Sequence, residues 1–180
     1  RFHIIPQPMS AALIAEMVAC YGAAAARLAE AGLDGVEIVA SHGYLPAQFL
    51  NPRINRRTDS YGGSLENRIR FLVEIAGAAR RRVGERIVGL RISGSERDQH
   101  DGLNADETLA ICKALEPHFD YFNVTMGTVT SLGSSIHSVP PMMLEPGYVA
   151  PVAGGIKAAI AKPVFVAGRI NRPDVAERIL

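Results

Sequence analysis

Cysteine is scarce in this sequence. The 180 residues include only Cys20 and Cys112, which lie far apart along the chain. Metal sites built from cysteine need ligands at short, regular spacings, so we expect no metal site of this kind. Isolated thiols are typical of proteins in a reducing compartment, and a cytoplasmic location is therefore the expectation.

Net charge and lysine are scarce as well. The formal net charge is +1, and there are three lysines, Lys113, Lys157 and Lys162. A chain so close to neutrality gives no support for a nucleic-acid partner. The other cations are arginines, which favour fixed, bidentate contacts with carboxylates or phosphates. Such contacts serve internal ion pairs as readily as a bound ligand.

Long apolar runs are missing too. No run approaches the roughly 20 residues that cross a bilayer, and the start shows no signal-peptide pattern, so we expect no membrane contact. Apolar residues still make up 48% of the chain and charged residues 21%, which is typical of a folded globular domain. The sequence begins at Arg1 without methionine and stops at Leu180 within a helical pattern. We therefore expect a piece of a longer protein, truncated at both ends.

Helical and strand-like patterns alternate along the chain. The strand-like segments are 35–40, 87–93, 121–127 and 163–168. Helical patterns run from the N-cap Ser10 to Gly32, from Ser64 to Gly84, over 105–116 after a capping box of Asn104 and Glu107, over 148–160, and from Asn171 and Pro173 onward. This order predicts an α/β fold with a parallel sheet. Four strands are half of a (β/α)8 barrel, and a doubly wound sheet is the alternative.

Polar residues gather where the predicted strands end. In both folds, ligands bind at the carboxyl ends of parallel strands. The candidates there are His42 and Tyr44 after the first strand, Arg91 near the end of the second, Gly127 after the third, and Gly168 with Arg169 after the fourth.

His42 and Tyr44 are two residues apart. In a cleft, an imidazole and a phenol can orient a substrate and transfer a proton. The alternative is a buried pair that anchors the loop. Arg91 interrupts an apolar strand, and an unpaired buried charge is costly, so it must meet either a ligand or a carboxylate. Glu37 is the main carboxylate available, and the scarcity of others favours a ligand.

The segment "AGRINRP" places Gly168 and Arg169 between a strand and a helix. Backbone N–H groups and a guanidinium at such a point can bind phosphate, although an ordinary turn has the same sequence features. No G-x-G-x-x-G motif follows a strand, which disfavours a Rossmann dinucleotide site.

The segment "NRRTDSYGGSLENRIRF" mixes arginines with carboxylates. We expect Arg56, Arg57, Asp59, Glu66, Arg68 and Arg70 to satisfy one another in a braced loop. Nucleic-acid binding would need exposed cations with interleaved aromatic residues, so the structural interpretation is favoured.

Two stretches, "AGLDGVEI" and "SHGYLPAQFLNPRINRRTDSYGGSLENRIRF", closely resemble the Old Yellow Enzyme superfamily of flavin oxidoreductases. The nearest branch holds 2,4-dienoyl-CoA reductase, trimethylamine dehydrogenase and N-methylproline demethylase; "GLRIS" and "PVFVAGRI" add support. The resemblance implies an FMN-binding (β/α)8 TIM barrel and an enzyme of NADH:flavin oxidoreductase type. Residues 1–180 would be the central part of that single domain, about strands four to seven. A 4Fe-4S cluster and a second nucleotide, FAD or NAD(P)H, would lie outside this chain.

The resemblance also implies roles for individual residues. Arg91 matches the arginine beside the flavin pyrimidine edge, where a cation stabilises reduced flavin. Gly168 and Arg169 match the loop that approaches the FMN phosphate. His42 matches the second member of the substrate-binding pair, and Tyr44 matches a tyrosine that donates a proton in many ene-reductases.

Val39 departs from the pattern of the enone reductases, which usually have histidine at this position as a second donor to a carbonyl. His137, in a long loop over the site, is a further candidate for substrate contact. The leading prediction is hydride transfer between a small-molecule substrate and FMN, in the form of oxidative demethylation of an N-methylated amino acid or amine. NAD(P)H-dependent reduction of activated C=C bonds is the alternative within the family. A non-catalytic half-barrel is the alternative of another class, and exposed strand edges would then favour a homo-oligomer.

Overall fold

One parallel sheet forms the centre of the computed structural model, which describes residues 7–180. The strands are β1 (Gly35–Ala40), β2 (Ile87–Ser93), β3 (Tyr121–Thr125) and β4 (Val164–Val166), and they lie in that order across the sheet. The register pairs Val39 with Arg91, Arg91 with Asn123, and Asn123 with Phe165. These four residues therefore form one row across the sheet.

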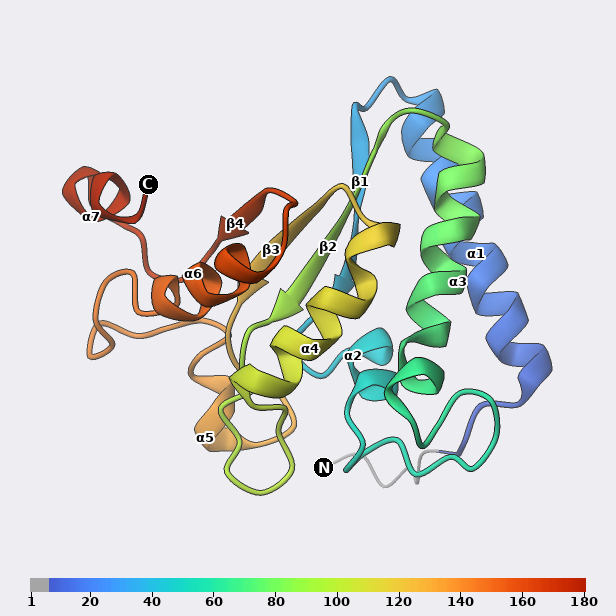
Figure 1. The fold of residues 1–180 in the computed structure, drawn as a ribbon, viewed down its shortest axis with the longest axis horizontal. Helices are drawn as coiled ribbons and strands as arrows, with labels where there is room; N and C mark the ends of the chain where they lie inside the picture. Colours follow the sequence, from blue (N-terminus) through green and yellow to red (C-terminus); the bar gives the residue numbers. More distant parts are fainter. Residues whose placement is uncertain (1–6) are drawn as a thin grey trace.

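Four of the helices each lead into a strand: α1 (Ala11–Glu30) into β1, α3 (Leu65–Val83) into β2, α4 (Ala105–Leu115) into β3, and α6 (Ala150–Ala159) into β4. The shorter helices α2 (Leu45–Leu50), α5 (Leu132–Ser135) and α7 (Pro173–Ile179) follow strands β1, β3 and β4, and a 3-10 turn, η1 (Glu116–His118), follows α4. The strands run downward in Figure 1, so their carboxyl ends meet near α2 and α5.

Burial shows that the helices cover one face of the sheet. Ile38, Leu90 and Val124 point to the covered face and are buried, as are the residues two positions away on their strands. On the other face, Val39 and Phe165 are exposed. A doubly wound sheet would carry helices on both faces, so consecutive strand order with one-sided cover identifies part of a (β/α)8 barrel. The uncovered face is called the interior face below.

The capping signals of the sequence hold in the structure. Ser10 and Ser64 accept hydrogen bonds from the third residue of their helices, and Asn104 forms the predicted capping box with Glu107. The last helix begins at Pro173, as predicted, but its N-cap is Arg172 and not Asn171.

The third and fourth strands are shorter than predicted, ending at Thr125 and Val166. Gly127 has φ of 85° and Gly168 has φ of 151°, which is incompatible with extended strand backbone. Helices α2 and α5 were not predicted, because each is shorter than the window in which helical periodicity can be recognised.

Helix α1 requires one correction. Among the residues that the structure describes, it is the helix whose length and composition would allow it to cross a membrane, so the expectation that no such segment exists is wrong. Core helices of globular domains meet the same criteria. In Figure 1, α1 packs along α3, and a Cβ on Gly22 would come within 3.2 Å of the carbonyl oxygen of Ala78. This close packing assigns α1 to the helical layer of the barrel.

The packing of α3 against the sheet yields a stability prediction. Leu72 is 0% exposed, so Leu72→Ala leaves a cavity and should lower the free energy of unfolding of the whole protein by about 2–5 kcal/mol. Leu33→Ala, at a half-exposed loop position, should cost less than about 1 kcal/mol. Denaturant titrations of both variants test this, and equal losses would contradict the packing described here.

Candidate active site

The turn after β1 has a strained backbone. His42 has φ of 58° and Gly43 has φ of 78°, a region that residues other than glycine seldom occupy. A Cβ on Gly43 would lie 2.5 Å from Oγ1 of Thr128, so the turn needs glycine at this position. The neighbouring segment fixes the turn, because Val129 N–H donates to the carbonyl of His42 at 3.0 Å.

Ser93 connects the ends of three strands. Its hydroxyl accepts a hydrogen bond from His42 N–H at 3.0 Å and donates one to the carbonyl of Gly127 at 2.8 Å. Ser93 closes β2, whereas His42 follows β1 and Gly127 follows β3. Ser93 was not among the residues predicted from the sequence; the signal that could have identified it is a polar residue at the carboxyl end of a buried strand.

The imidazole of His42 is half-buried. Burial, the largest influence, lowers the pKa of His42; the nearby carbonyl of Gly127 opposes this shift, and the Arg91 cation adds to it. Nδ1 is buried and has no hydrogen-bond partner within the described part of the chain. His42 is therefore neutral at neutral pH.

Tyr44 lies next to His42, as the sequence predicts. Their rings are 6.3 Å apart between centroids in an edge-to-face arrangement, and Tyr44 is 54% exposed. An exposed phenol beside a neutral imidazole can donate a proton to a bound molecule. The alternative in which both residues are buried as loop anchors does not fit this exposure.

Arg91 has a protein partner, contrary to the slight preference for a ligand. Its Nε donates to Oε1 of Glu37 at 2.6 Å on the interior face. In the register, Glu37 lies opposite Gly89, and Arg91 follows Gly89 by two residues on β2. Both side chains therefore point to the same face. No hydrogen bond occupies the two terminal guanidinium nitrogens within residues 7–180, so Arg91 can pair with Glu37 and still contact a ligand.

The turn after β4 also has an unusual backbone. Arg169 has φ of 53°, and a Cβ on Gly168 would lie 2.4 Å from Cγ2 of Val149. One terminal nitrogen of Arg169 donates to the carbonyl of Pro141 at 2.9 Å, while its Nε is buried without a partner among the described residues. This arrangement can accept an anion, which is the chemistry predicted for the FMN phosphate.

His137 lines a cavity of about 660 Å³ between the loops that follow β2 and β3. Its ring lies 5.6 Å from that of Tyr148, whose hydroxyl donates to the carbonyl of His137. Burial lowers the pKa of His137, and the Arg97 cation lowers it further. A Cβ on Gly127 would come within 2.7 Å of the Cβ of His137, so this cavity adjoins the end of β3.

The arginine-rich loop is braced in part by the expected mutual ion pairs. Arg57 pairs with Asp59 at 2.5 Å, and Arg70 pairs with Glu66 at 3.9 Å. Arg68 instead donates to the backbone carbonyls of Leu50 and Gly63 at 2.8 and 2.5 Å. The loop has no regular secondary structure, so several of its backbone carbonyls lack backbone partners. These carbonyls are therefore available to accept hydrogen bonds from the guanidinium groups.

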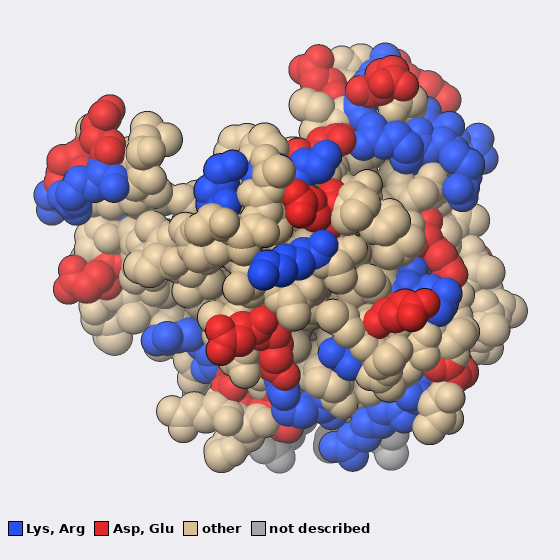
Figure 2. Space-filling model, viewed as in Figure 1, with Lys and Arg blue, Asp and Glu red and all other residues tan. Residues whose placement is uncertain are grey.

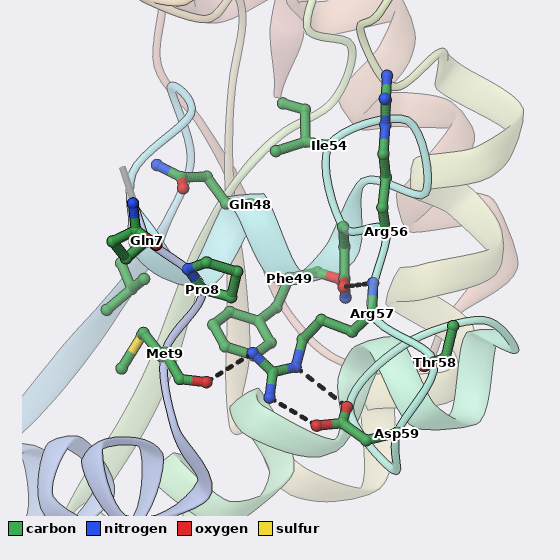
Figure 3. Close-up of a pocket in the computed structure, with 12 residues that line it drawn as sticks. Gln7, Pro8, Met9, Gln48, Phe49, Ile54, Arg56, Arg57, Thr58 and Asp59 are labelled. Carbon is green, nitrogen blue, oxygen red and sulfur yellow. Dashed lines mark hydrogen bonds and ion pairs between the residues drawn. The ribbon is translucent and has the colours of Figure 1, made fainter. Parts of the chain in front are cut away.

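A second cavity, of about 630 Å³, lies beside this loop. Figure 3 shows Arg57 bridging its wall, bonded both to Asp59 and to the carbonyl of Met9 at 2.8 Å. Phe49 and Ile54 make part of the lining apolar. The cavity was not predicted, because it forms between segments far apart in the sequence.

Charges of both signs lie side by side over much of the face in Figure 2. The ion pairs of the chain include Arg80 with Asp120 at 2.5 Å. Within residues 7–180, no group of three or more histidine, cysteine or carboxylate side chains is arranged to hold a metal ion.

The strand-end cluster on part of a (β/α)8 barrel is the setting in which many enzymes bind cofactor and substrate. Residues 2–180 match the model of the NADH:flavin oxidoreductase / NADH oxidase family, and the chain belongs to that family. This confirms the resemblance drawn from the sequence, and it supports FMN as the cofactor of the family.

Two curated relatives are similar over most of the chain. A "Metal reductase" of Desulforamulus reducens is 41% identical, with 97% of this chain and 26% of the relative covered. An "N,N-dimethylglycine/sarcosine dehydrogenase" of Chromohalobacter salexigens is 38% identical, with 87% of this chain and 23% of the relative covered. A solved 2-naphthoyl-CoA reductase complex superposes with a TM-score of 0.86 at 36% identity, with coverage of 96% and 26%. The chain thus spans about a quarter of the length of these proteins.

The environment of His42 predicts its titration. With its pKa lowered, His42 should titrate below the ordinary value of about 6.5. The unfolded chain then binds more protons in this range. The contribution of His42 to stability is therefore present above pH about 6.5 and is lost as the pH falls through the folded pKa. NMR of ¹³C-labelled histidine, assigned with His42→Asn, tests this. A pKa at or above 6.5 would contradict the burial of the ring.

Proposed function

We propose that the protein containing this chain is an FMN-dependent oxidoreductase that oxidatively demethylates an N-methylated amino acid or amine. The observation that carries the proposal is the cluster at the strand ends. There, a neutral His42 with an unpartnered nitrogen lies beside the exposed phenol of Tyr44, and the Arg91 cation lies close enough to lower the pKa of His42.

The residues present fit FMN. Arg91 would use its free terminal nitrogens toward the pyrimidine edge, while Gly168 and Arg169 would hold the phosphate. The buried Nε of Arg169 lacks a partner among the described residues, which leaves a donor for the phosphate. Bound flavin supplies the acceptor or donor for a hydride. The chain itself contributes binding, orientation and fixed charge.

Val39 supports amine oxidation over enone reduction. It is 38% exposed on the interior face, three residues before His42, and it cannot donate a hydrogen bond. A carbonyl substrate would therefore find one donor where the enone reductases have two. An amine needs no such pair, because its nitrogen must be uncharged to lose a hydride and a neutral His42 can accept its proton. The similarity to a dimethylglycine and sarcosine dehydrogenase points the same way.

NAD(P)H-dependent reduction of activated C=C bonds is the second candidate. The exposed hydroxyl of Tyr44 suits the proton donation that this reaction requires, and the chain is similar to a 2-naphthoyl-CoA reductase. A 4Fe-4S cluster and a second nucleotide would lie outside residues 1–180. We further propose a cytoplasmic enzyme with a small-molecule substrate and no nucleic-acid or membrane partner. A non-catalytic half-barrel would lack flavin colour, which distinguishes it from both enzymes.

A substrate panel tests the proposal. Under anaerobic conditions, dimethylglycine, N-methylproline or trimethylamine should bleach the flavin absorbance of the whole protein, because each can transfer a hydride to the flavin. Cyclohexenone should reoxidise the dithionite-reduced protein slowly. Rapid reoxidation by the enone, with no bleaching by any amine, would overturn amine oxidation in favour of the second candidate. A colourless protein would overturn both.

The role of Val39 gives a separate prediction. Val39→His supplies the missing donor, and one hydrogen bond is worth about 0.5–1.5 kcal/mol, so kcat/KM for cyclohexenone should rise roughly two- to tenfold. Val39→Leu changes size without adding a donor and is the matched control. Equal effects of the two substitutions in steady-state assays would show that volume, not hydrogen bonding, matters at this position.

A further inference from the structure

Glu37 accepts hydrogen bonds from three side chains on the interior face. Its Oε1 accepts from Arg91 Nε at 2.6 Å, and its Oε2 accepts from the Tyr121 hydroxyl and from Asn123 Nδ2, each at 2.9 Å. The four side chains come from β1, β2 and β3. A carboxylate with both oxygens bonded to donors on two other strands has one fixed orientation.

Glycine makes the hydrogen bond between Tyr121 and Glu37 possible. Tyr121 reaches Glu37 across β2 because its ring lies over Gly89, where an added Cβ would be 2.1 Å from the ring carbon Cζ. Phe165 packs edge-to-face against the same ring, with 5.0 Å between centroids. Burial and the Glu37 carboxylate raise the pKa of Tyr121 to about 12, so its hydroxyl remains a donor across the physiological range.

The contact with Glu37 engages only part of the Arg91 guanidinium. Glu37 engages Nε, on one edge of the guanidinium, and leaves the two terminal nitrogens without hydrogen bonds in the described residues. A planar guanidinium held along one edge has its other donors aimed in a set direction. The negative charge of Glu37 also offsets part of the positive field of Arg91, and the interior of a closed barrel would screen that interaction little.

We propose that Glu37, fixed by Tyr121 and Asn123, is a positioning residue that aims Arg91 and sets the reduction potential of the bound FMN. The inference rests on the proposed function, because it requires FMN next to Arg91. Reduction adds negative charge to the flavin, so the potential depends on the net charge of the Arg91–Glu37 pair.

Glu37→Gln should raise the potential. The amide oxygen can still accept from Arg91 Nε, so the guanidinium stays in place while the opposing negative charge is lost. We expect the equilibrium ratio of reduced to oxidised FMN at a fixed potential to rise about tenfold, which corresponds to about 30 mV for a two-electron couple. A dye-equilibration titration of the whole protein measures this shift.

Tyr121→Phe should shift the potential in the opposite direction. It removes a donor that disperses the negative charge of Glu37, and it leaves the charges of Glu37 and Arg91 in place. The equilibrium ratio of reduced to oxidised FMN at a fixed potential should therefore fall about two- to threefold. A purely structural role would make both variants shift the potential the same way or not at all. Tyr121→Phe also keeps the inference testable if Glu37→Gln does not fold.

Glu74→Gln is the matched control. Glu74 accepts from the Tyr61 hydroxyl at 3.0 and 3.2 Å on helix α3, away from the interior face, so the same chemical change there should leave the potential unchanged. Shifts of opposite sign with an unchanged control support the inference. A yellow protein in which either variant leaves the potential unchanged or shifts it the other way overturns the inference alone. A wild-type protein without bound flavin overturns the proposed function with it.

Discussion

The ion pair between Arg91 and Glu37 is the constraint on which the site depends. A guanidinium in the interior of a barrel is tolerated only when it is paired and hydrogen-bonded, and the 2.6 Å contact with Glu37 meets that need. Parallel register brings the two residues together from neighbouring strands. Because Glu37 takes only one edge of Arg91, the same pair that makes the charge tolerable also leaves donors for a flavin.

The turns that carry the candidate site residues are held by β1, β2 and β3, the strands that also carry Glu37, Arg91 and Asn123. Ser93 joins the turn after β1 to the turn after β3, so His42 is held above the strands that carry Arg91 and Asn123. The strained backbone at His42 is then fixed by neighbours on both sides rather than by its own preference. A rigid sheet thereby sets the distance between Arg91, proposed to meet the cofactor, and the imidazole of His42, proposed to meet the substrate.

The sequence was sufficient for the fold class, and it named candidate site residues at the strand ends. Alternating periodicities predict a parallel α/β sheet, and the resemblance of specific segments to a flavoenzyme family implies the barrel. Parallel strands place polar residues such as His42 at one edge. The partners of those residues were harder to predict. That Arg91 meets Glu37, and that Tyr121 reaches Glu37 across Gly89, depends on side-chain directions and close contacts between strands. The cavity beside Arg57 depends likewise on the meeting of distant segments.

A crystal structure of the whole protein with its flavin would test the central claim most directly. We predict FMN at the carboxyl ends of the strands, with the terminal nitrogens of Arg91 within about 2.7–3.2 Å of the flavin ring. Arg91 Nε would still be bonded to Glu37, and the phosphate would lie against Gly168 and Arg169. A flavin bound elsewhere, or an Arg91 that leaves Glu37 to reach the cofactor, would contradict this account.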